Sequence, residues 1–107
     1  MGPGQWSTGK ATQEINACAK SASLNITFVK PVKDRLRERG LIMGDALYVL
    51  RRGFVLEDPG TTTRPGFFKY LIEATTPNSE GRTVGILVIP DGCCMLKLTD
   101  VKWRDEL

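Results

Sequence analysis

Residues 67–103 read FFKYLIEATTPNSEGRTVGILVIPDGCCMLKLTDVKW, and this stretch decides the fold. Three runs in it have the apolar, β-branched and aromatic content of strands, namely 67–74, 83–89 and 95–103. The breakers PNSEG and PDG between them are too short to contain a crossover helix, so the three strands should be antiparallel neighbours. In the first run Tyr70 and Ile72 point to one face and Lys69 to the other, which predicts a sheet with one covered face.

The chain before this stretch contains one further strand and three helices. The fourth strand is predicted at 54–57, and the segment LNITFV at 24–29 has the content of a short strand or an extended lead-in. A first helix is predicted over 7–22, capped by Ser7. Its apolar stripe is the set Ala11, Ile15, Cys18 and Ala22, which recur at helical spacing.

Two short helices are predicted within residues 31–52. The first covers 31–39, because Pro31 suits a first turn and Gly40 suits the left-handed position after a last turn. The second covers about 44–52 and is followed by Gly53. We therefore expect an α+β fold in which N-terminal helices pack on one face of a four-stranded, mainly antiparallel twisted sheet, with residues 54–103 as an antiparallel strand meander.

Length and composition indicate one ordinary globular domain over residues 1–107. The chain of 107 residues is 41% hydrophobic and 25% charged. No apolar run approaches the roughly 20 residues of a membrane-spanning helix. The N-terminus MGPGQWSTGK lacks the apolar core of a signal peptide. The expected location is the cytosol, with no membrane partner.

The residue types present limit the chemistry. The chain has no histidine, and its cysteines, Cys18, Cys93 and Cys94, have no metal-ligand spacing. We expect reduced, structural cysteines, no metal and no cofactor. Any reaction must use Lys, Arg, Asp, Glu, Tyr, Ser or Thr side chains.

Positive charge is concentrated in the helix predicted at 31–39. Residues 30–39 carry five cations and two acids, whereas the whole chain has a net charge of +3. Arg35 and Arg39 are spaced four residues apart, so they share one edge of the helix beside the core side of Val32 and Leu36. A guanidinium at the border of a core needs an acid, a carbonyl or a bound anion.

Two interpretations of this arginine pair remain open. In the structural one, Arg35 and Arg39 form salt bridges that tie the helix to acids such as Glu57, Asp58 or Glu73. In the functional one, they face the sheet and hold phosphate groups. Further candidates for phosphate contacts are Lys30, Lys33, Lys69, Arg82, Lys97 and Lys102. Tyr70 is expected to pack in the core with its hydroxyl at the rim, and a catalytic role for it is the less favoured alternative.

Four runs carry a resemblance that covers about nine tenths of the chain: FVKPVKDRLRERGLIMGDALYVLRRGFV, GFFKYLIEAT, GRTVGILVIP and CMLKLTDVKW. In these runs the chain resembles a widespread bacterial domain family related to BrnT, MqsR and the RelE/ParE toxin superfamily. The family motif H-x-x-x-R-x-x-x-R-G places its arginines on Arg35 and Arg39 and its glycine on Gly40. Its histidine falls on Pro31, which can supply neither a proton nor an anion contact.

The resemblance implies a RelE-like fold and a toxin of a toxin–antitoxin pair that cleaves RNA without metal. Arg35, Arg39 and Arg82 would hold the phosphate, and Tyr70 or Lys69 would manage protons. Proline at position 31 implies either an inactive member or chemistry carried by other residues. The alternatives are a non-catalytic RNA- or protein-binding module and a plain interaction protein with structural arginines. RNA, a cognate antitoxin and a second copy of the chain are the candidate partners.

Overall fold

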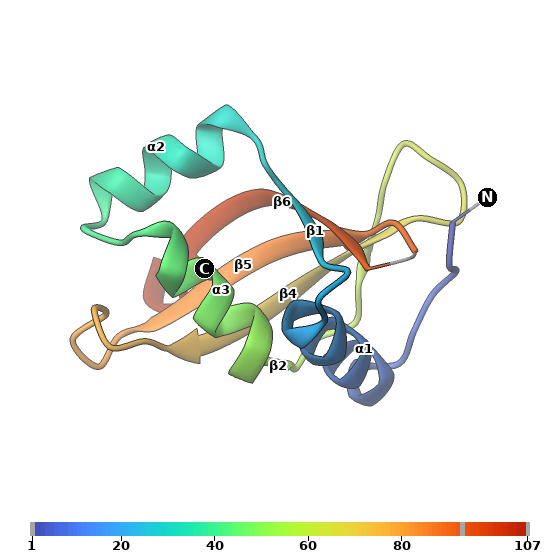
Figure 1. The fold of residues 1–107 in the computed structure, drawn as a ribbon, viewed down its shortest axis with the longest axis horizontal. Coiled ribbons are helices and arrows are strands. Elements are labelled where there is room, and N and C mark those ends of the chain that lie inside the picture. Colours follow the sequence, from blue (N-terminus) through green and yellow to red (C-terminus); the bar gives the residue numbers. More distant parts are fainter. Residues whose placement is uncertain (1, 93, 107) are drawn as a thin grey trace.

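A computed structural model describes residues 2–92 and 94–106 of the protein. The helices are α1 (Thr8–Lys20), α2 (Lys30–Glu38), α3 (Met43–Arg52) and a short 3-10 turn, η1 (Arg104–Glu106). The strands are β1 (Asn25–Phe28), β2 (Phe54–Val55), β3 (Gly60–Thr61), β4 (Phe68–Thr75), β5 (Thr83–Pro90) and β6 (Met95–Trp103). Figure 1 shows the helices gathered around one side of a strongly twisted sheet.

The sheet is mostly antiparallel, as predicted, but it has six strands and not four. Its order is β1-β6-β5-β4-β2, and β3 pairs with β4 outside this path. The two extra strands are short and lie at edges. β1 pairs in parallel with β6, and β3 forms inside the loop that follows β2. β1 lies within the segment 24–29, for which a short strand is one of two predicted alternatives, whereas β3 lies in a segment predicted as a loop.

One face of the sheet forms the core with the helices. The inward residues of β4, β5 and β6 lie opposite one another across the strands and are all buried: Tyr70, Val88 and Leu98, then Ile72, Ile86 and Val101. α3 lies against β4 and β5, α1 packs on α3, and α2 runs beside β6 (Figure 1). The predicted covered face is therefore confirmed. The stripe of α1 ends at Ala19 and not at Ala22, because the helix itself ends at Lys20.

A Schellman motif ends α2. The Gly40 amide donates to the Arg37 carbonyl (3.1 Å), and the Leu41 amide donates to the Leu36 carbonyl (2.8 Å). Gly40 has φ +69°, the left-handed conformation predicted for it. Leu36 and Leu41 are both buried, so the turn also makes the apolar contact that accompanies this motif.

Replacing Gly40 by alanine should lower the free energy of unfolding by about 1 kcal/mol, because a Cβ is strained at positive φ. No atom lies within 4 Å of the added Cβ, so the cost is conformational and not steric. Denaturant unfolding measures it. Gly9→Ala is the matched control: Gly9 lies in α1 with equally open surroundings, and there alanine should stabilise the helix. Equal effects of the two substitutions would contradict this account.

Asp45 fixes the start of α3. Its side chain is buried and accepts hydrogen bonds from the Ile42 backbone amide (2.9 Å), the Thr76 hydroxyl (2.7 Å) and the Asn78 side-chain amide (3.1 Å). The first bond caps the helix, and the other two join the helix to the turn between β4 and β5. The link between α2 and α3 is therefore held at both ends, by Gly40 and by Asp45.

Gly53 ends α3 for a different reason from Gly40. Its φ is −79°, which any residue can adopt. A Cβ at this position would lie 2.5 Å from the Val49 carbonyl oxygen and 2.8 Å from that of Glu73. The glycine is thus needed both for the tight turn off the end of α3 and for the close approach to β4. Within the described part of the chain, no helix has the length and apolar character needed to cross a membrane.

Candidate functional site

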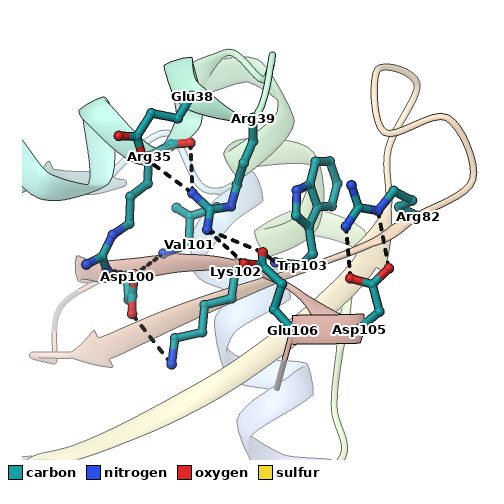
Figure 2. A network of polar contacts seen from close by, with 10 residues as sticks. All are labelled: Arg35, Glu38, Arg39, Arg82, Asp100, Val101, Lys102, Trp103, Asp105 and Glu106. Carbon is teal, nitrogen blue, oxygen red and sulfur yellow. Dashed lines mark hydrogen bonds and ion pairs between the residues drawn. The ribbon is translucent and has the colours of Figure 1, made fainter.

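The clearest polar cleft lies between α2 and the end of β6. It has a volume of about 330 Å³ and is lined by Arg35, Arg39, Asp100, Val101, Lys102 and Glu106. Figure 2 shows the two arginines descending from α2 toward β6, as their shared helix edge predicts. Of the residues predicted to contact phosphate or substrate, Arg35, Arg39 and Lys102 meet in this cleft.

Arg35 and Asp100 form the central contact of the cleft. An Arg35 Nη1 atom donates to the carboxylate of Asp100, and Lys102 Nζ lies 3.8 Å from the other oxygen of the same carboxylate. Asp100 also accepts from the Val101 amide at 2.8 Å. The Asp100 side chain is mostly shielded from solvent, whereas Arg35 and Lys102 are each about two fifths exposed. Both cations therefore retain surface that a ligand can reach.

A β-bulge brings Asp100 to the cleft. Leu87 of β5 pairs with Asp100, but Val88 pairs with Leu98, so Thr99 is the extra residue of the bulge. Leu98 and Val101 can then both face the core, while Asp100 and Lys102 face away from it. If the strand alternated without a break, Asp100 would lie on the buried face with Leu96 and Leu98. An acid at such a position is unfavourable, and it is therefore the sequence signal for the bulge.

The end of β1 opens the edge of β6 to α2. β1 pairs with β6 only as far as Leu98, so from Thr99 onward that edge has no strand neighbour. α2 follows β1 after a single intervening residue and lies beside the free edge. Arg35 can therefore reach around the edge to Asp100.

Arg39 is the more enclosed of the two arginines. Its side chain is 17% exposed, and its Nη2 atom lies 3.3 Å from Glu106 Oε1. Nη1 donates to the Arg35 carbonyl at 3.3 Å and lies 3.8 Å from Glu38. Its Nε atom is buried without a hydrogen-bond partner among the described residues. A buried donor without a partner lowers the stability of the fold, and a hydrogen bond to a bound anion or water would offset that cost.

The turn η1 supplies the acids at the end of the cleft. The Glu106 carboxylate accepts from the Trp103 amide at 2.9 Å, and this bond, with help from Arg39, lowers the pKa of Glu106. The next acid, Asp105, pairs with Arg82 at 2.9 Å, which lowers the pKa of Asp105. Arg82 also lies over the Trp103 ring, 4.0 Å from its centroid. Figure 2 shows these two separate pairs near each other, and together with the cleft they are here called the row of charges.

The acids that pair with the two arginines differ from those predicted. Arg35 contacts Asp100 and Arg39 contacts Glu106, so the expectation of Glu57, Asp58 or Glu73 was wrong in its partners. Glu57 and Glu73 each lie 3.5 Å from Arg104 instead. Asp100 and Glu106 were missed because the bulge and η1, which position them, are set by tertiary packing.

Tyr70 does not line the cleft. It is buried on the covered face, where its hydroxyl accepts from the Trp6 amide at 2.8 Å and its ring stacks on Trp6. Burial raises the pKa of Tyr70, so the hydroxyl stays protonated at neutral pH. Lys69 lies next to Tyr70 in β4 and therefore points to the opposite face. The structure thus separates Tyr70 from Arg35 and Arg39.

The other predicted phosphate contacts are distributed over several surfaces. Lys97 is exposed on the uncovered side of the sheet, between the buried Leu96 and Leu98. On α2, Lys30 pairs with Asp34 at 3.3 Å, and both Lys33 and Pro31 are exposed. Arg82 belongs to the row of charges but not to the lining of the cleft.

The described cysteines are free thiols. Cys18 and Cys94 are both half-buried, and burial together with the neighbouring Cys94 raises the pKa of Cys18 to about 12. The Cys18 thiol is therefore protonated and unreactive at neutral pH, as a structural cysteine would be. Cys93, the other member of the predicted vicinal pair, lies outside the described residues.

Comparison with protein-family models, curated proteins and solved structures gives no match. The resemblance to the BrnT and RelE/ParE toxins therefore stays a hypothesis that rests on the motif residues.

Proposed function

We propose that the chain is an RNA-binding module that holds the phosphate backbone in the cleft between α2 and β6. The observation that carries this proposal is the convergence of Arg35, Arg39 and Lys102 on one open polar cleft. Lys102 lies more than sixty residues after Arg35 and Arg39 in the chain. Guanidinium and ammonium groups are the usual protein contacts to phosphate oxygens.

A phosphate that enters the cleft would have to replace the carboxylates that already pair with its cations. Three cations face two carboxylates, so the lining has one positive charge in excess. A phosphate would replace Asp100 as the partner of Arg35 and Lys102, and it would reach the enclosed guanidinium of Arg39. Because each arginine exchanges one anion for another, we expect modest affinity that falls with salt.

Binding without cleavage fits the residues better than catalysis. The family histidine is replaced by Pro31, and the hydroxyl of Tyr70 is occupied by the Trp6 amide away from the cleft. The lowered pKa of Glu106 makes its carboxylate a weak base. The module would thus hold RNA without an efficient group to remove the ribose 2′-hydroxyl proton.

A metal-independent endoribonuclease, acting as a toxin with a cognate antitoxin, is the second candidate. The feature that favours it is the placement of carboxylates among cations. Asp100 would accept the 2′-hydroxyl proton as the 2′-oxygen attacks phosphorus, while Arg35 and Lys102 would stabilise the charge on the phosphoryl oxygens. The 5′-oxygen would leave with a proton from solvent.

Fluorescence anisotropy with a fluorescein-labelled single-stranded RNA tests the binding proposal. Lys102→Ala should weaken binding about fivefold, which corresponds to about 1 kcal/mol for one exposed charge contact. It should also reduce the slope of log affinity against log salt by about 0.7, the value for one lost phosphate contact. Lys10→Ala removes an exposed cation from α1 and should change neither quantity. Equal losses in both variants, or binding that ignores salt, would refute the cleft as the RNA site.

Gel analysis of the same RNA separates the two candidates. The binding module leaves the RNA intact, whereas the endoribonuclease yields fragments that disappear when the ribose 2′-hydroxyls are replaced by hydrogen. Pro31→His extends the test. If Pro31→His cleaves the RNA and the wild type does not, the proline at position 31 is what inactivates the toxin. Arrest of cell growth when the variant is expressed would support that conclusion.

A further inference from the structure

Two exposed apolar patches lie at opposite ends of α3. Five large hydrophobic residues are strongly exposed in the described part of the chain, and four of them belong to these patches. Ile42 (61% exposed) and Met43 (46%) begin the helix, while Phe54 (62%) and Leu56 (65%) follow its end. Figure 1 shows α3 running from its link with α2 to β2, so the two patches lie at its two ends.

The first patch is a groove rimmed by cations, here named the basic groove. It has a volume of about 310 Å³ and is lined by Lys33, Leu36, Arg37, Leu41, Ile42 and Met43. The buried Leu36 and Leu41 form its floor. Both charged lining residues are positive. Arg37 lies 3.6 Å from the carboxylate of Asp34, which does not line the groove.

The basic groove is presented on a fixed backbone. The Gly40 turn holds one end of the link between α2 and α3, and the Asp45 carboxylate binds the Ile42 amide at the other. Little backbone freedom is therefore lost when a partner docks. The groove lies on the opposite edge of α2 from the cleft, because Lys33 and Arg37 are about 200° around the helix from Arg35 and Arg39.

The second patch is a protrusion, here named the β2 knob. Phe54 and Leu56 flank the buried Val55, so both side chains point away from the core. The acids Glu57 and Asp58 follow directly, and Arg104 lies 3.5 Å from Glu57. Two exposed cations precede the knob: Arg51 donates to the Ala19 carbonyl of α1, and Arg52 lies over the Tyr48 ring of α3.

We propose that the β2 knob of one copy docks in the basic groove of a second copy, so that the chain associates head to tail along α3. Phe54 and Leu56 would cover Ile42 and Met43, and Asp58 would meet the Lys33 and Arg37 rim. Two grooves cannot pair with each other in this way, because their cations would be juxtaposed. The contact is heterologous and leaves a free groove and a free knob at the ends of each dimer.

Sedimentation equilibrium of the intact protein tests this arrangement. We expect the weight-average mass to rise above the 11.8 kDa monomer over roughly 10 µM to 1 mM, the range suited to a small interface. Ile42→Ser and Leu56→Ser should each weaken association at least tenfold. Ile42 is the N-cap of α3, where serine is favourable, so loss of folding is not expected there. Met95→Ser, at the remaining exposed hydrophobic residue, is the matched control.

Mixing the two single variants gives the decisive result. Ile42→Ser retains a knob and Leu56→Ser retains a groove, so the mixture should form a 1:1 dimer that neither variant forms alone. Circular dichroism of each variant confirms that the fold is intact. A monomer throughout the concentration range would overturn the proposal. It would also be overturned by a dimer that is lost in Ile42→Ser but kept in Leu56→Ser, since that pattern indicates groove-to-groove contact.

Discussion

Asp45→Ala should lower the free energy of unfolding by about 3 kcal/mol. The substitution removes three hydrogen bonds at once, from the Ile42 amide, the Thr76 hydroxyl and the Asn78 amide. Each bond to a buried carboxylate contributes about 1.5 to 3 kcal/mol, but bonds that share one acceptor do not add fully. Thr76 is itself buried, so its hydroxyl would be left without a partner. Urea unfolding followed by circular dichroism measures the loss.

Two variants bracket this effect. Asp45→Asn keeps the shape and one carbonyl oxygen, so it should cost about half as much. Asp58→Ala removes an exposed aspartate from a loop and should change stability by less than about 0.5 kcal/mol. A comparable loss in Asp45→Ala and Asp58→Ala would mean that the carboxylate does not organise the start of α3.

The contribution of Asp45 also depends on pH. Burial acts to raise the pKa of its carboxyl, but the hydrogen bonds from Ile42, Thr76 and Asn78 outweigh burial and lower the pKa below its ordinary value of 3.8. The folded state therefore binds the proton less tightly than the unfolded state. The stabilisation by the Asp45 carboxylate is complete above its ordinary pKa, and it is lost as the pH falls through its lower pKa in the folded state. The gap in stability between wild type and Asp45→Asn should narrow below about pH 4. A constant gap from pH 7 to pH 3 would contradict this linkage.

Gly53→Ala should also cost about 3 kcal/mol, and for a steric reason. The added Cβ would lie 2.5 Å from the Val49 oxygen and 2.8 Å from the Glu73 oxygen, and both are backbone atoms that cannot rotate away. The last turn of α3 would have to distort and the chain would have to move from β4, which disturbs the buried contacts between the two elements. Thermal unfolding should show a lower midpoint with unchanged cooperativity.

Gly60→Ala is the control for this substitution. Gly60 also lies in a short strand beside β4, but no atom lies within 4 Å of its added Cβ. Alanine there should be nearly neutral. If both substitutions destabilise equally, the close approach of α3 to β4 is not what requires glycine at position 53.

The sequence predicts the elements of this fold better than it predicts their long-range pairing. The predicted meander appears as β4, β5 and β6 because alternation and short breakers are local properties. Gly40 is identified in advance for the same reason. The parallel pairing of β1 with β6 joins Asn25 to Met95, and no local pattern encodes it.

The candidate site shows the same division. The position of Arg35 and Arg39 on one helix edge follows from their spacing, and both line the cleft. Their acidic partners do not follow, because Asp100 depends on a bulge and Glu106 on η1. The sequence does not show that Tyr70 lies outside the site of Arg35 and Arg39. Strand alternation predicts which face of the sheet a residue occupies, but not its distance from a given helix.

The pairing of β1 with β6 constrains the order of events during synthesis. β1 leaves the ribosome early, but the strand that completes it lies about seventy residues later. Until then the nascent chain carries an unpaired edge and helices whose apolar sides have no sheet to cover. Final assembly must therefore wait until β6 has left the ribosome exit tunnel and can pair with β1. Chaperone dependence should accordingly be greatest in the interval before β6 emerges.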